Sequence, residues 1–322
     1  SSEEHFFAEG DNPHKRALDW MLFDDLLIQS NTADSIVRSR YVVVLMYMSM
    51  GGETWTPVSD FLEPSARTCT WGYYIDEFVG FRRFTCTSDE SIEDLSFNQM
   101  NLSNQIITEI SALQYLRQLN LGSNRLTGTI PTHLGLLSNL FALRLGEYAR
   151  IICTSRMEGT THRSFEIYAA VYVHCLCHRH SDAILSHFPN ASSVSSFCHC
   201  NTRTTLFFEP SQHKSPRTPG DNNLHGPIPS VIGNMPELTA FYVHNNVDLS
   251  GTVPTEVAVL PRLRQIQMQY TNVTNIELFC NRTDTISLFL SDCLDDDVLC
   301  TCCTSCCAAD PSLNLCFDRF AR

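Results

Sequence analysis

Cysteine and histidine are the residues of this chain whose types and spacing could do chemistry. Residues 147–220 hold seven of the twelve histidines and five of the fifteen cysteines. Thiolate sulfur and imidazole nitrogen are the ligands that Zn²⁺ prefers, and the order C-x-C-H-x-H suggests a metal site. The spacing fits no zinc finger, so metal-binding or enzymatic activity seated in this segment is kept as the alternative function. Its candidate ligands are Cys175, Cys177, His178, His180, Cys198 and His199.

A second group of cysteines crowds the C-terminus. The run CTCCTSCC at residues 300–307 is compatible with a thiolate metal cluster or with disulfides, and Asp295, Asp296 and Asp297 could hold Ca²⁺. An acidic chain with several glycosylation sequons favours disulfides that close the end of the fold, and a solvated turn for the aspartates. We therefore predict no metal site. The cysteines expected in disulfides are Cys69, Cys86, Cys280, Cys293, Cys300, Cys302, Cys303, Cys306, Cys307 and Cys316.

Sequence motifs of enzymes are missing: the chain has no G-x-S-x-G, no H-E-x-x-H and no Walker loop. We expect no catalytic residue, no cofactor and no enzyme activity. The net charge of −13 argues against nucleic acid as a partner, because the phosphate backbone requires a basic face. No apolar run reaches the length of a membrane span, and the most apolar one, residues 41–50, ends at Gly51-Gly52 like a buried helix.

Cysteine content and sequons together indicate an extracellular or cell-surface protein. Sequons occur at four asparagines, of which we expect Asn101, Asn272 and Asn281 to be glycosylated, and the fourth is Asn190. The chain does not begin with Met, so a signal peptide or membrane anchor can lie outside it.

A repeat organises the chain. Residues 114–137 read QYLRQLNLGSNRLTGTIPTHLGLL, and similar spacing returns at residues 92–113, 138–146, 221–235, 236–260 and 261–278. A unit this short cannot bury its own apolar face, so it must stack on its neighbours and form a solenoid. The first unit is two residues short of the standard length, with Asn101 in the place of the motif's asparagine, and the unit at 261–278 is degenerate.

Each position of the repeat has a structural role. The L-x-x-L-x-L stretch predicts a short parallel strand whose leucines point inward, and the following asparagine can bond the backbone of the adjacent turn. Gly and Pro in L-x-G-x-I-P set a second turn. We predict an α/β solenoid with one parallel sheet, whose strands lie near residues 94–98, 118–122, 142–146, 240–244 and 265–269.

Caps are expected at both ends of the stack, where an apolar edge would otherwise be open. The N-terminal cap, residues 1–90, has two predicted helices at 14–29 and 35–50, followed by Trp55, Cys69-Thr-Trp71 and Cys86. In the predicted helix at 14–29, Leu18, Met21, Leu22, Leu26 and Leu27 share one face. The predicted units are then 91–146, an insertion at 147–220, repeats at 221–278, and a cysteine-rich C-terminal cap at 279–322.

These G-x-I-P repeats behind a helical cap with a CxW motif resemble the plant-type leucine-rich repeat family. Within it the chain is most similar to secreted or receptor-like proteins of algae such as diatoms, through Arg40-Tyr41 with Leu45 and Tyr47, the Cys69-Thr-Trp71 motif, and the tail at residues 292–307. The resemblance implies a curved solenoid that binds proteins, peptides or glycans outside the cell. With the isolation of the pair from other cysteines, it also implies a Cys69–Cys86 disulfide that stabilises the first repeat by about 2–4 kcal/mol.

The segment at residues 147–220 interrupts the third repeat between its strand and its asparagine. Removing these 74 residues joins the halves as SNLFALRLGDNNLHGPIPSVIGNM, in phase with the second repeat. Three interpretations are open: a genuine insertion loop, the metal site above, and a translated intron. Gly146-Glu147-Tyr148 can be encoded with a GTGAGT donor and Pro219-Gly220 with a CAG acceptor, and we favour the intron, with poor packing or disorder expected in either case.

The binding surface follows from strand alternation, which turns the residues between the leucines toward the inner, concave curve of the sheet. One predicted row is Ser96, Asn120, Arg144, Tyr242 and Gln267, with Asn98, Gly122, Gly146, His244 and Gln269 beside it. Arg and Tyr are residue types that often anchor interfaces, although each of these residues could equally be an ordinary solvated strand residue. The residues expected to bind a protein, peptide or glycan ligand are Asn120, Arg144, Tyr242, His244, Gln267 and Gln269.

Overall fold

The protein is described here by a computed structural model that covers residues 12–56, 60–72, 74–75, 80–81, 83–146, 222–282, 285–294, 300–308 and 316–318. The predictions for residues 147–220, including the candidate metal ligands, lie outside these residues, as do those for Asn190 and for Asp295, Asp296 and Asp297. Within the described residues, no helix combines the length and the apolar character needed to cross a bilayer.

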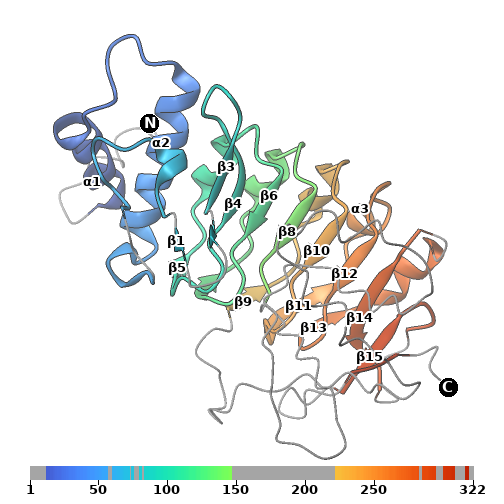
Figure 1. Ribbon diagram of the computed structural model, residues 1–322. Coiled ribbons are helices and arrows are strands. Elements are labelled where there is room, and N and C mark those ends of the chain that lie inside the picture. Colours follow the sequence, from blue (N-terminus) through green and yellow to red (C-terminus); the bar gives the residue numbers. More distant parts are fainter. Residues whose placement is uncertain are drawn as a thin grey trace, which may run out of the picture.

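The predicted parallel sheet is confirmed, and it is longer than expected. The strands expected from the leucine spacing are β4 (Ile92–Ser96), β6 (Gln118–Asn120), β8 (Ala142–Arg144), β10 (Ala240–Tyr242) and β12 (Gln265–Gln267), and they pair side by side in that order. The sheet continues through β14 (Leu288–Asp292), β15 (Ser305–Cys307) and β16 (Cys316–Asp318), and begins at β3 (Phe84–Cys86), so that nine strands form one stack (Figure 1). The two end strands, β3 and β16, pair antiparallel with their neighbours.

A second sheet of five strands runs along the other side of the coils, and the sequence analysis did not predict it. Its order is β13-β11-β9-β7-β5, and all of its pairs are parallel. In four of its strands one apolar residue, such as Leu126 or Leu224, lies between polar neighbours, whereas β5 contains only polar residues. The strands are β5 (Ser103–Gln105), β7 (Arg125–Gly128), β9 (Asn223–Gly226), β11 (Asp248–Thr252) and β13 (Asn272–Thr274).

Short helical turns close each coil between the two sheets. They are η5 (Thr108–Ala112), η6 (Thr132–Leu136), η8 (Ser230–Asn234), α3 (Thr255–Ala258) and η9 (Ile276–Arg282). Before each of these turns the chain passes through one residue with positive φ, a conformation that glycine and asparagine adopt most easily. Gly128 (φ 80°) and Gly226 (φ 77°) hold this place in the second and third coils, as the G-x-I-P motif predicts.

The asparagine of the repeat bonds neighbouring coils together inside the core. Asn124 is buried, and its Oδ1 accepts the N–H groups of Met100 and Leu102, each at 3.0 Å. Its Nδ2 donates to the carbonyl oxygens of Phe97 and Leu121. Backbone groups that would be stranded at the end of each strand are thereby satisfied.

The first coil differs from the sequence prediction. Asp94 pairs with Gln118, a spacing of 24 residues, so this coil has the full length. Met100 occupies the place of the motif's asparagine, and Asn104 (φ 67°) takes the place of the glycine. The prediction that this first repeat is two residues short was wrong, because neither the asparagine position nor the glycine position of the motif carries its usual residue.

The N-terminal cap is built around a buried ion pair. Helix α2 (Asp34–Ser49) carries Arg40, whose side chain is 1% exposed and whose Nε donates to the buried carboxylate of Asp25. The Arg40 guanidinium lies 4.3 Å from the ring centre of Trp71 and 5.3 Å from that of Trp20. Arg40 and the CxW motif therefore belong to one cluster, which covers the first coil.

Helix α1 (Pro13–Asp19) ends earlier than predicted. A π-helical turn, η2 (Trp20–Asp24), follows it and adds a residue to that turn, which rotates the later side chains off the expected face. Met21 is buried, but Leu22 is 64% exposed and Leu26 is also exposed. The shared apolar face predicted for residues 14–29 is therefore wrong.

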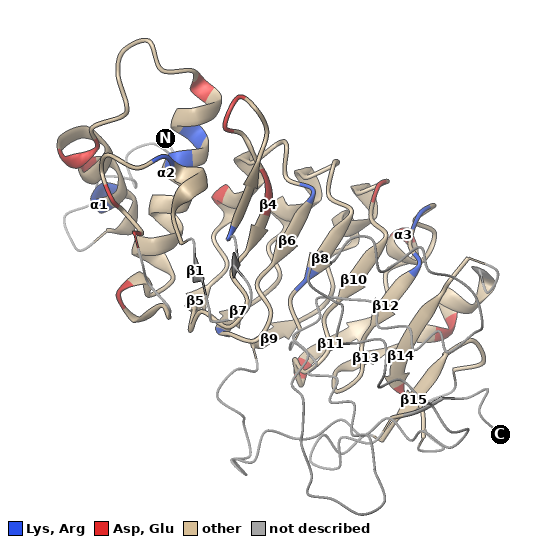
Figure 2. Cartoon of the chain, viewed as in Figure 1, with Lys and Arg blue, Asp and Glu red and all other residues tan. Residues whose placement is uncertain are grey.

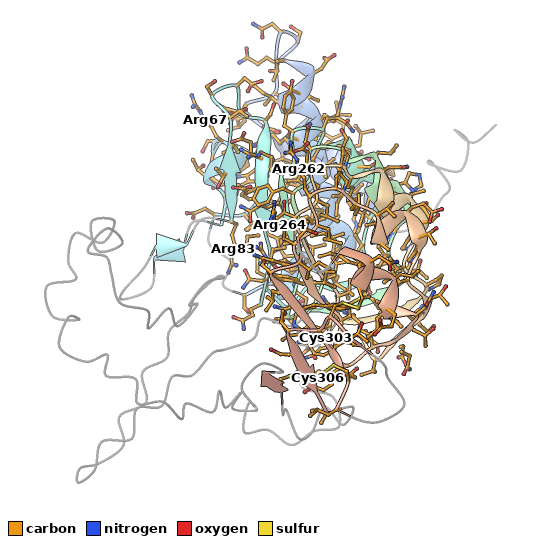
Figure 3. All side chains as sticks on the ribbon, turned by 90° about the vertical axis from the view of Figure 1, so that its right-hand side faces the viewer. Arg67, Arg83, Arg262, Arg264, Cys303 and Cys306 are labelled. Carbon is orange, nitrogen blue, oxygen red and sulfur yellow. A yellow bond between two sulfur atoms is a disulfide. The ribbon has the colours of Figure 1, made fainter. Side chains whose placement is uncertain are left out.

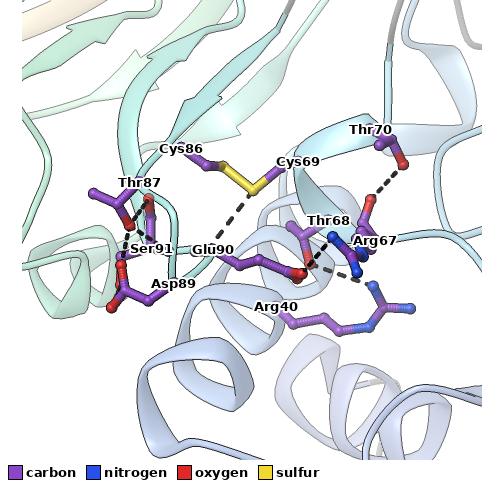
Figure 4. The surroundings of a disulfide bond; sticks show 10 residues. All are labelled: Arg40, Arg67, Thr68, Cys69, Thr70, Cys86, Thr87, Asp89, Glu90 and Ser91. Atoms are coloured by element: carbon purple, nitrogen blue, oxygen red, sulfur yellow. Dashed lines mark hydrogen bonds and ion pairs between the residues drawn. A yellow bond between two sulfur atoms is a disulfide. The ribbon is translucent and has the colours of Figure 1, made fainter.

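The remaining cap elements link α2 to the sheet. They are η3 (Gly52–Thr54), η4 (Thr68–Thr70), β1 (Tyr74–Ile75) and β2 (Gly80–Phe81). A disulfide joins Cys69 beside the CxW tryptophan to Cys86 at the end of β3, with the two Cα atoms 6.2 Å apart (Figure 4). An ion pair of 3.2 Å between Arg67 and Glu90 lies next to it. The first strand of the sheet is thereby tied covalently to the cap.

Four disulfides close the C-terminal end of the stack, where Cys303 and Cys306 are labelled in Figure 3. Two groups of three sulfur atoms lie close enough together to hold a metal ion, but every one of these atoms is in a disulfide, which leaves no thiolate to act as ligand. The pairs are Cys280–Cys302, Cys293–Cys306, Cys300–Cys303 and Cys307–Cys316.

Candidate ligand-binding face

The predicted central row of the binding face lies in register across the nine-stranded sheet. Backbone pairing places Ser96 beside Asn120, Asn120 beside Arg144, Arg144 beside Tyr242, and Tyr242 beside Gln267. The preceding residue of each strand is fully buried in the core. Because side chains alternate along a strand, the row points away from the core. We call this side of the sheet the open face.

The residues of the neighbouring rows come from the same strands. On one side, Gln118, Ala142, Ala240 and Gln265 are in register. On the other side lie Gly122, Gly146, His244 and Gln269. A Cβ atom added to Gly146 would come within 2.5 Å of His244 Nδ1, so the imidazole lies directly over this glycine. The structure therefore brings together all six residues that the sequence analysis selected.

Several of these side chains are less accessible than the sequence analysis expected. Tyr242 is 6% exposed, His244 3% and Gln269 6%, whereas Arg144 and Gln267 are half-buried. Neighbouring residues of the face cover one another: the Tyr242 hydroxyl donates to Gln265 Oε1, and the rings of Tyr242 and His244 lie 6.4 Å apart. The open face is thus a packed polar layer, in which Arg144 and Gln267 are the accessible members of the predicted site.

Arg144 is held at the centre of the open face. Its Nη1 donates to Gln118 Oε1 at 3.1 Å, and its guanidinium lies 5.5 Å from the ring centre of Tyr242. Its Nε is buried and has no hydrogen-bond acceptor among the described residues. The side chain is therefore positioned by two neighbours while part of its donor capacity is unused.

Arg83 extends the row toward the N-terminal cap, and the sequence analysis missed it. It precedes β3, and its carbonyl oxygen accepts the Ser96 N–H at 2.9 Å. Phe84, the next residue, is buried in the core, so Arg83 faces the open side. Arg83 precedes the first repeat, and the alternation with Phe84 is the only sequence signal that could have indicated it.

The Arg83 side chain reaches over the end of β4. Its Nη1 donates to the carbonyl oxygens of Ser96 at 3.4 Å and Asn98 at 3.2 Å, and its Nε is buried without an acceptor in the described part of the chain. Burial lowers the pKa of the Arg83 guanidinium, because a charged group loses solvation there. Arg83 and Arg144 thus share the same incomplete hydrogen bonding.

Acidic residues are missing from the middle of the open face. The described strands β6, β8, β10 and β12 contain no Asp or Glu, and Figure 2 shows no red on them. Arg117 and Arg264 directly precede β6 and β12. The nearest carboxylates in the sheet are Asp94 on β4 and Asp292 at the end of β14. In a chain with a net charge of −13, this concentration of arginine is local.

The expected glycosylation sites lie on other parts of the surface. Asn272 is exposed at the start of β13, in the five-stranded sheet, and its Nδ2 donates to the carbonyl oxygen of Val247 at 2.8 Å. Asn101 precedes β5, and its Nδ2 donates to the Thr54 carbonyl oxygen at 3.0 Å. Asn281 is exposed in η9. Glycosylation of these residues stays a prediction.

Comparisons with known proteins give structural likeness only. No protein-family model and no curated protein matches the sequence. Among solved structures, the chain is similar to the PEPR1–AtPEP1 complex, with a TM-score of 0.42 and 17% identity over 74% of this chain and 23% of that one. A plant ice-binding protein gives a TM-score of 0.44 and 14% identity over 82% of this chain and 55% of that one.

A third similar structure is the leucine-rich repeat ectodomain of the receptor kinase GASSHO1/SCHENGEN3 from Arabidopsis thaliana, in complex with CASPARIAN STRIP INTEGRITY FACTOR 2. Its TM-score is 0.40, with 17% sequence identity over 73% of this chain and 21% of that one. This chain therefore spans less than a quarter of the length of the PEPR1–AtPEP1 and GASSHO1/SCHENGEN3 chains that it matches. The fold is a leucine-rich repeat solenoid. Similarity to algal repeat proteins stays a prediction.

Proposed function

We propose that the protein is an extracellular, non-catalytic interaction module, receptor-like or associated with the cell wall, which binds a protein, peptide or glycan through the open face. The observation that carries the proposal is the row of polar side chains from Ser96 to Gln267, kept in register over five strands. A repeated strand offers a partner one contact per coil, so a long ligand can be bound without a deep pocket.

The disulfides support the location. Ten cysteines form five bonds, which is a state that persists in oxidising compartments outside the cytosol. The location of the expected glycosylation sites is also consistent, because Asn272 is directed away from the open face and a glycan there would leave this face accessible.

A selection experiment tests the binding face. A phage library of random 12-residue peptides would be selected on the folded, disulfide-bonded full chain, and the binders tested against Gln267→Ala and Tyr242→Ala. We expect binding to fall at least tenfold in both variants and to be unchanged in Thr252→Ala, an exposed residue of the five-stranded sheet. Melting curves would show that each variant is folded. Binders that are insensitive to the open-face variants would contradict the proposal.

The alternative function is metal-binding or enzymatic activity in residues 147–220, which lie outside the described residues. Metal analysis of the purified full chain separates the two proposals. Stoichiometric zinc that is lost in the double variant Cys175→Ser and Cys177→Ser would favour the alternative.

A further inference from the structure

Arg83 and Arg144 on the open face form no ion pair with a carboxylate of the described residues. The ion pairs of the described residues are His14–Glu109, Lys15–Asp19, Arg40–Asp25, Arg67–Glu90 and Arg262–Glu237, and none of them includes Arg83 or Arg144. Both arginines are partly desolvated, and each has a buried Nε–H without an acceptor in the described residues. A buried donor on a cation is costly unless an acceptor completes it.

We propose that Arg83 and Arg144 form a two-point site for the carboxylates of an acidic peptide. The inference rests on the proposed function and specifies the chemistry of the ligand. Arginine suits this role because its planar guanidinium pairs with a carboxylate through two parallel hydrogen bonds. The Nη2 group of each side chain is available for such a pair, since within the described chain only Nη1 is hydrogen-bonded and the buried unpaired nitrogen is Nε.

The spacing of the two cations selects the spacing of the carboxylates. The Arg83 guanidinium reaches the end of β4, and Arg144 leans from β8 back toward β6 through its bond to Gln118. Strands lie about 4.8 Å apart, and Arg144 stays over β8 because its guanidinium also lies beside Tyr242 on β10, so the two guanidinium groups are about two strand spacings apart, roughly 10 Å. In an extended peptide, residues i and i+2 lie on the same side about 7 Å apart. Two glutamates at i and i+2 can reach both arginines, because their flexible side chains can spread apart to cover the remaining distance.

The surface between the arginines is formed by β6. Asn120 lies between them on this strand, and the Gly146 carbonyl oxygen fills the place that a side chain of Gly122 would take. Asn120 Oδ1 accepts the N–H of Gly122, so the amide is kept low against the sheet. Asp94, one row away on β4, forms no ion pair with either arginine.

Side chains elsewhere on the open face favour a peptide over an acidic glycan. Amides match the donors and acceptors of a peptide backbone, and they recur at Gln118, Asn120, Gln265, Gln267 and Gln269. Gln267 is half-buried and offers its amide to a peptide backbone. Sugar rings bind best on exposed aromatic faces, but Tyr242 is 6% exposed and its hydroxyl bonds to Gln265.

The charge of the chain limits the attraction of an acidic peptide to the neighbourhood of the two arginines. The chain carries a net charge of −13, so an acidic peptide is repelled at long range and attracted only near the arginines. At about 0.1 M salt, repulsion between charges more than about 10 Å apart is largely screened, whereas the attraction within a desolvated ion pair is screened much less. Binding should therefore weaken less with salt than for a peptide that binds an exposed basic patch.

The peptide selection described above also tests this inference, through the sequences that it recovers. We expect binders of the open face to carry Asp or Glu at two positions i and i+2. A synthetic peptide Ac-SESES-amide should bind at least tenfold more tightly than Ac-SQSQS-amide, and Arg144→Gln or Arg83→Gln should remove the difference. Arg125→Gln, an exposed arginine on β7, is the matched control and should leave it unchanged.

Asn120→Asp provides a second variant that does not depend on removing an arginine. The new carboxylate lies between the two cations and keeps the acceptor for the Gly122 N–H. We expect it to raise the melting temperature and to abolish the preference for the glutamate peptide. Unchanged binding in Asn120→Asp would overturn the inference.

The outcomes separate this inference from the proposed function. Binders that depend on Gln267 and Tyr242 but carry no acidic pair would overturn the inference and leave the proposed function intact. Tighter binding of an oligogalacturonate than of Ac-SESES-amide would overturn the peptide as ligand. If no binder depends on the open face, both proposals fail.

Discussion

The second and third coils have the same geometry, although only the second is continuous in the chain. Asn124 and Asn222, Gly128 and Gly226, and η6 and η8 are equivalent pairs, each separated by 98 residues. Of these, 74 belong to the segment 147–220 and the other 24 are one repeat. The third coil is therefore built as if residues 146 and 221 were joined.

Equivalent hydrogen bonds occur in the second and third coils. Asn124 Nδ2 donates to the Leu121 carbonyl oxygen, three residues before it, at 2.9 Å. Asn222 Nδ2 donates to the equivalent carbonyl oxygen, that of Leu145, at 2.8 Å across the segment 147–220. The neighbouring coils thus set the shape of a coil, because each strand and turn is templated by the ones beside it. Chain continuity within the coil is not needed for this geometry.

The largest loss of stability is expected from the inward leucines of the two coils. Leu121 and Leu145 are equivalent and fully buried. Each change to Ala removes buried apolar volume and leaves a cavity, which should lower the free energy of unfolding by about 2–5 kcal/mol. Denaturant titration followed by circular dichroism measures both losses.

Similar losses are expected for Leu121→Ala and Leu145→Ala, because both coils are packed between complete neighbours. The control is Leu136→Ala, since Leu136 is 59% exposed and should cost little. A much smaller loss for Leu145→Ala would show that the interrupted coil is held more loosely than the continuous one.

The asparagines should give the next largest effect. Asn124→Ala strands backbone groups in its own coil and in the preceding one, and Asn222→Ala strands the Leu126 N–H with the Leu121 and Leu145 carbonyl oxygens. We expect losses of about 1–3 kcal/mol, with the larger one for Asn124, which makes more bonds.

One coil of the chain has a threonine in place of the motif's asparagine, and this threonine suggests a control variant. Thr271 stands in the equivalent place of a later coil, where its Oγ1 donates to the Met268 carbonyl oxygen at 2.7 Å. Asn222→Thr should therefore be less destabilising than Asn222→Ala in the same titration. Equal losses would mean that the bond across residues 147–220 contributes nothing.

The repeat pattern predicted what depends on leucine spacing. It predicted the order of five strands in the nine-stranded sheet, the second turn at Gly and Pro of each motif, and the phase of the third coil on either side of residues 147–220. It also placed Arg144 and Tyr242 in one row, because alternation along a strand needs no knowledge of the partner strand. These features all follow from local periodicity.

Other features depend on contacts that no short stretch of sequence contains. The strands of the five-stranded sheet carry at most one apolar residue each, so their signal is too weak to be recognised. The π-helical turn after α1 contains Trp20, whose ring lies beside the Arg40 guanidinium, a contact between residues 20 positions apart. Arg83 lies outside the repeat, and the burial of Tyr242 and His244 arises from neighbours on other coils.

Deletion of residues 147–220, which joins Gly146 to Asp221, should cause no loss of stability. Gly146 and Asn222 already lie as Gly122 and Asn124 do, with the Ser123 N–H bonded to the Gly146 carbonyl oxygen at 3.2 Å and Asn222 bonded to Leu145. A direct connection can therefore be made without moving either strand. The ladder of Asn124, Asn222 and Asn246 would then run through a continuous chain.

The free energy of unfolding of the deletion variant should equal or exceed that of the full chain, because closing a long loop has an entropic cost that grows with its length. Thermal melts of both forms, and sequencing of the transcript across residues 146–221, measure the effect and its origin. Leu145→Ala should lower the free energy of unfolding by the same amount in the deletion variant as in the full chain, since the packing around Leu145 is unchanged. If the deletion variant unfolds, or loses a bound metal together with part of its melting temperature, then residues 147–220 are a genuine domain and the two coils are not equivalent after all.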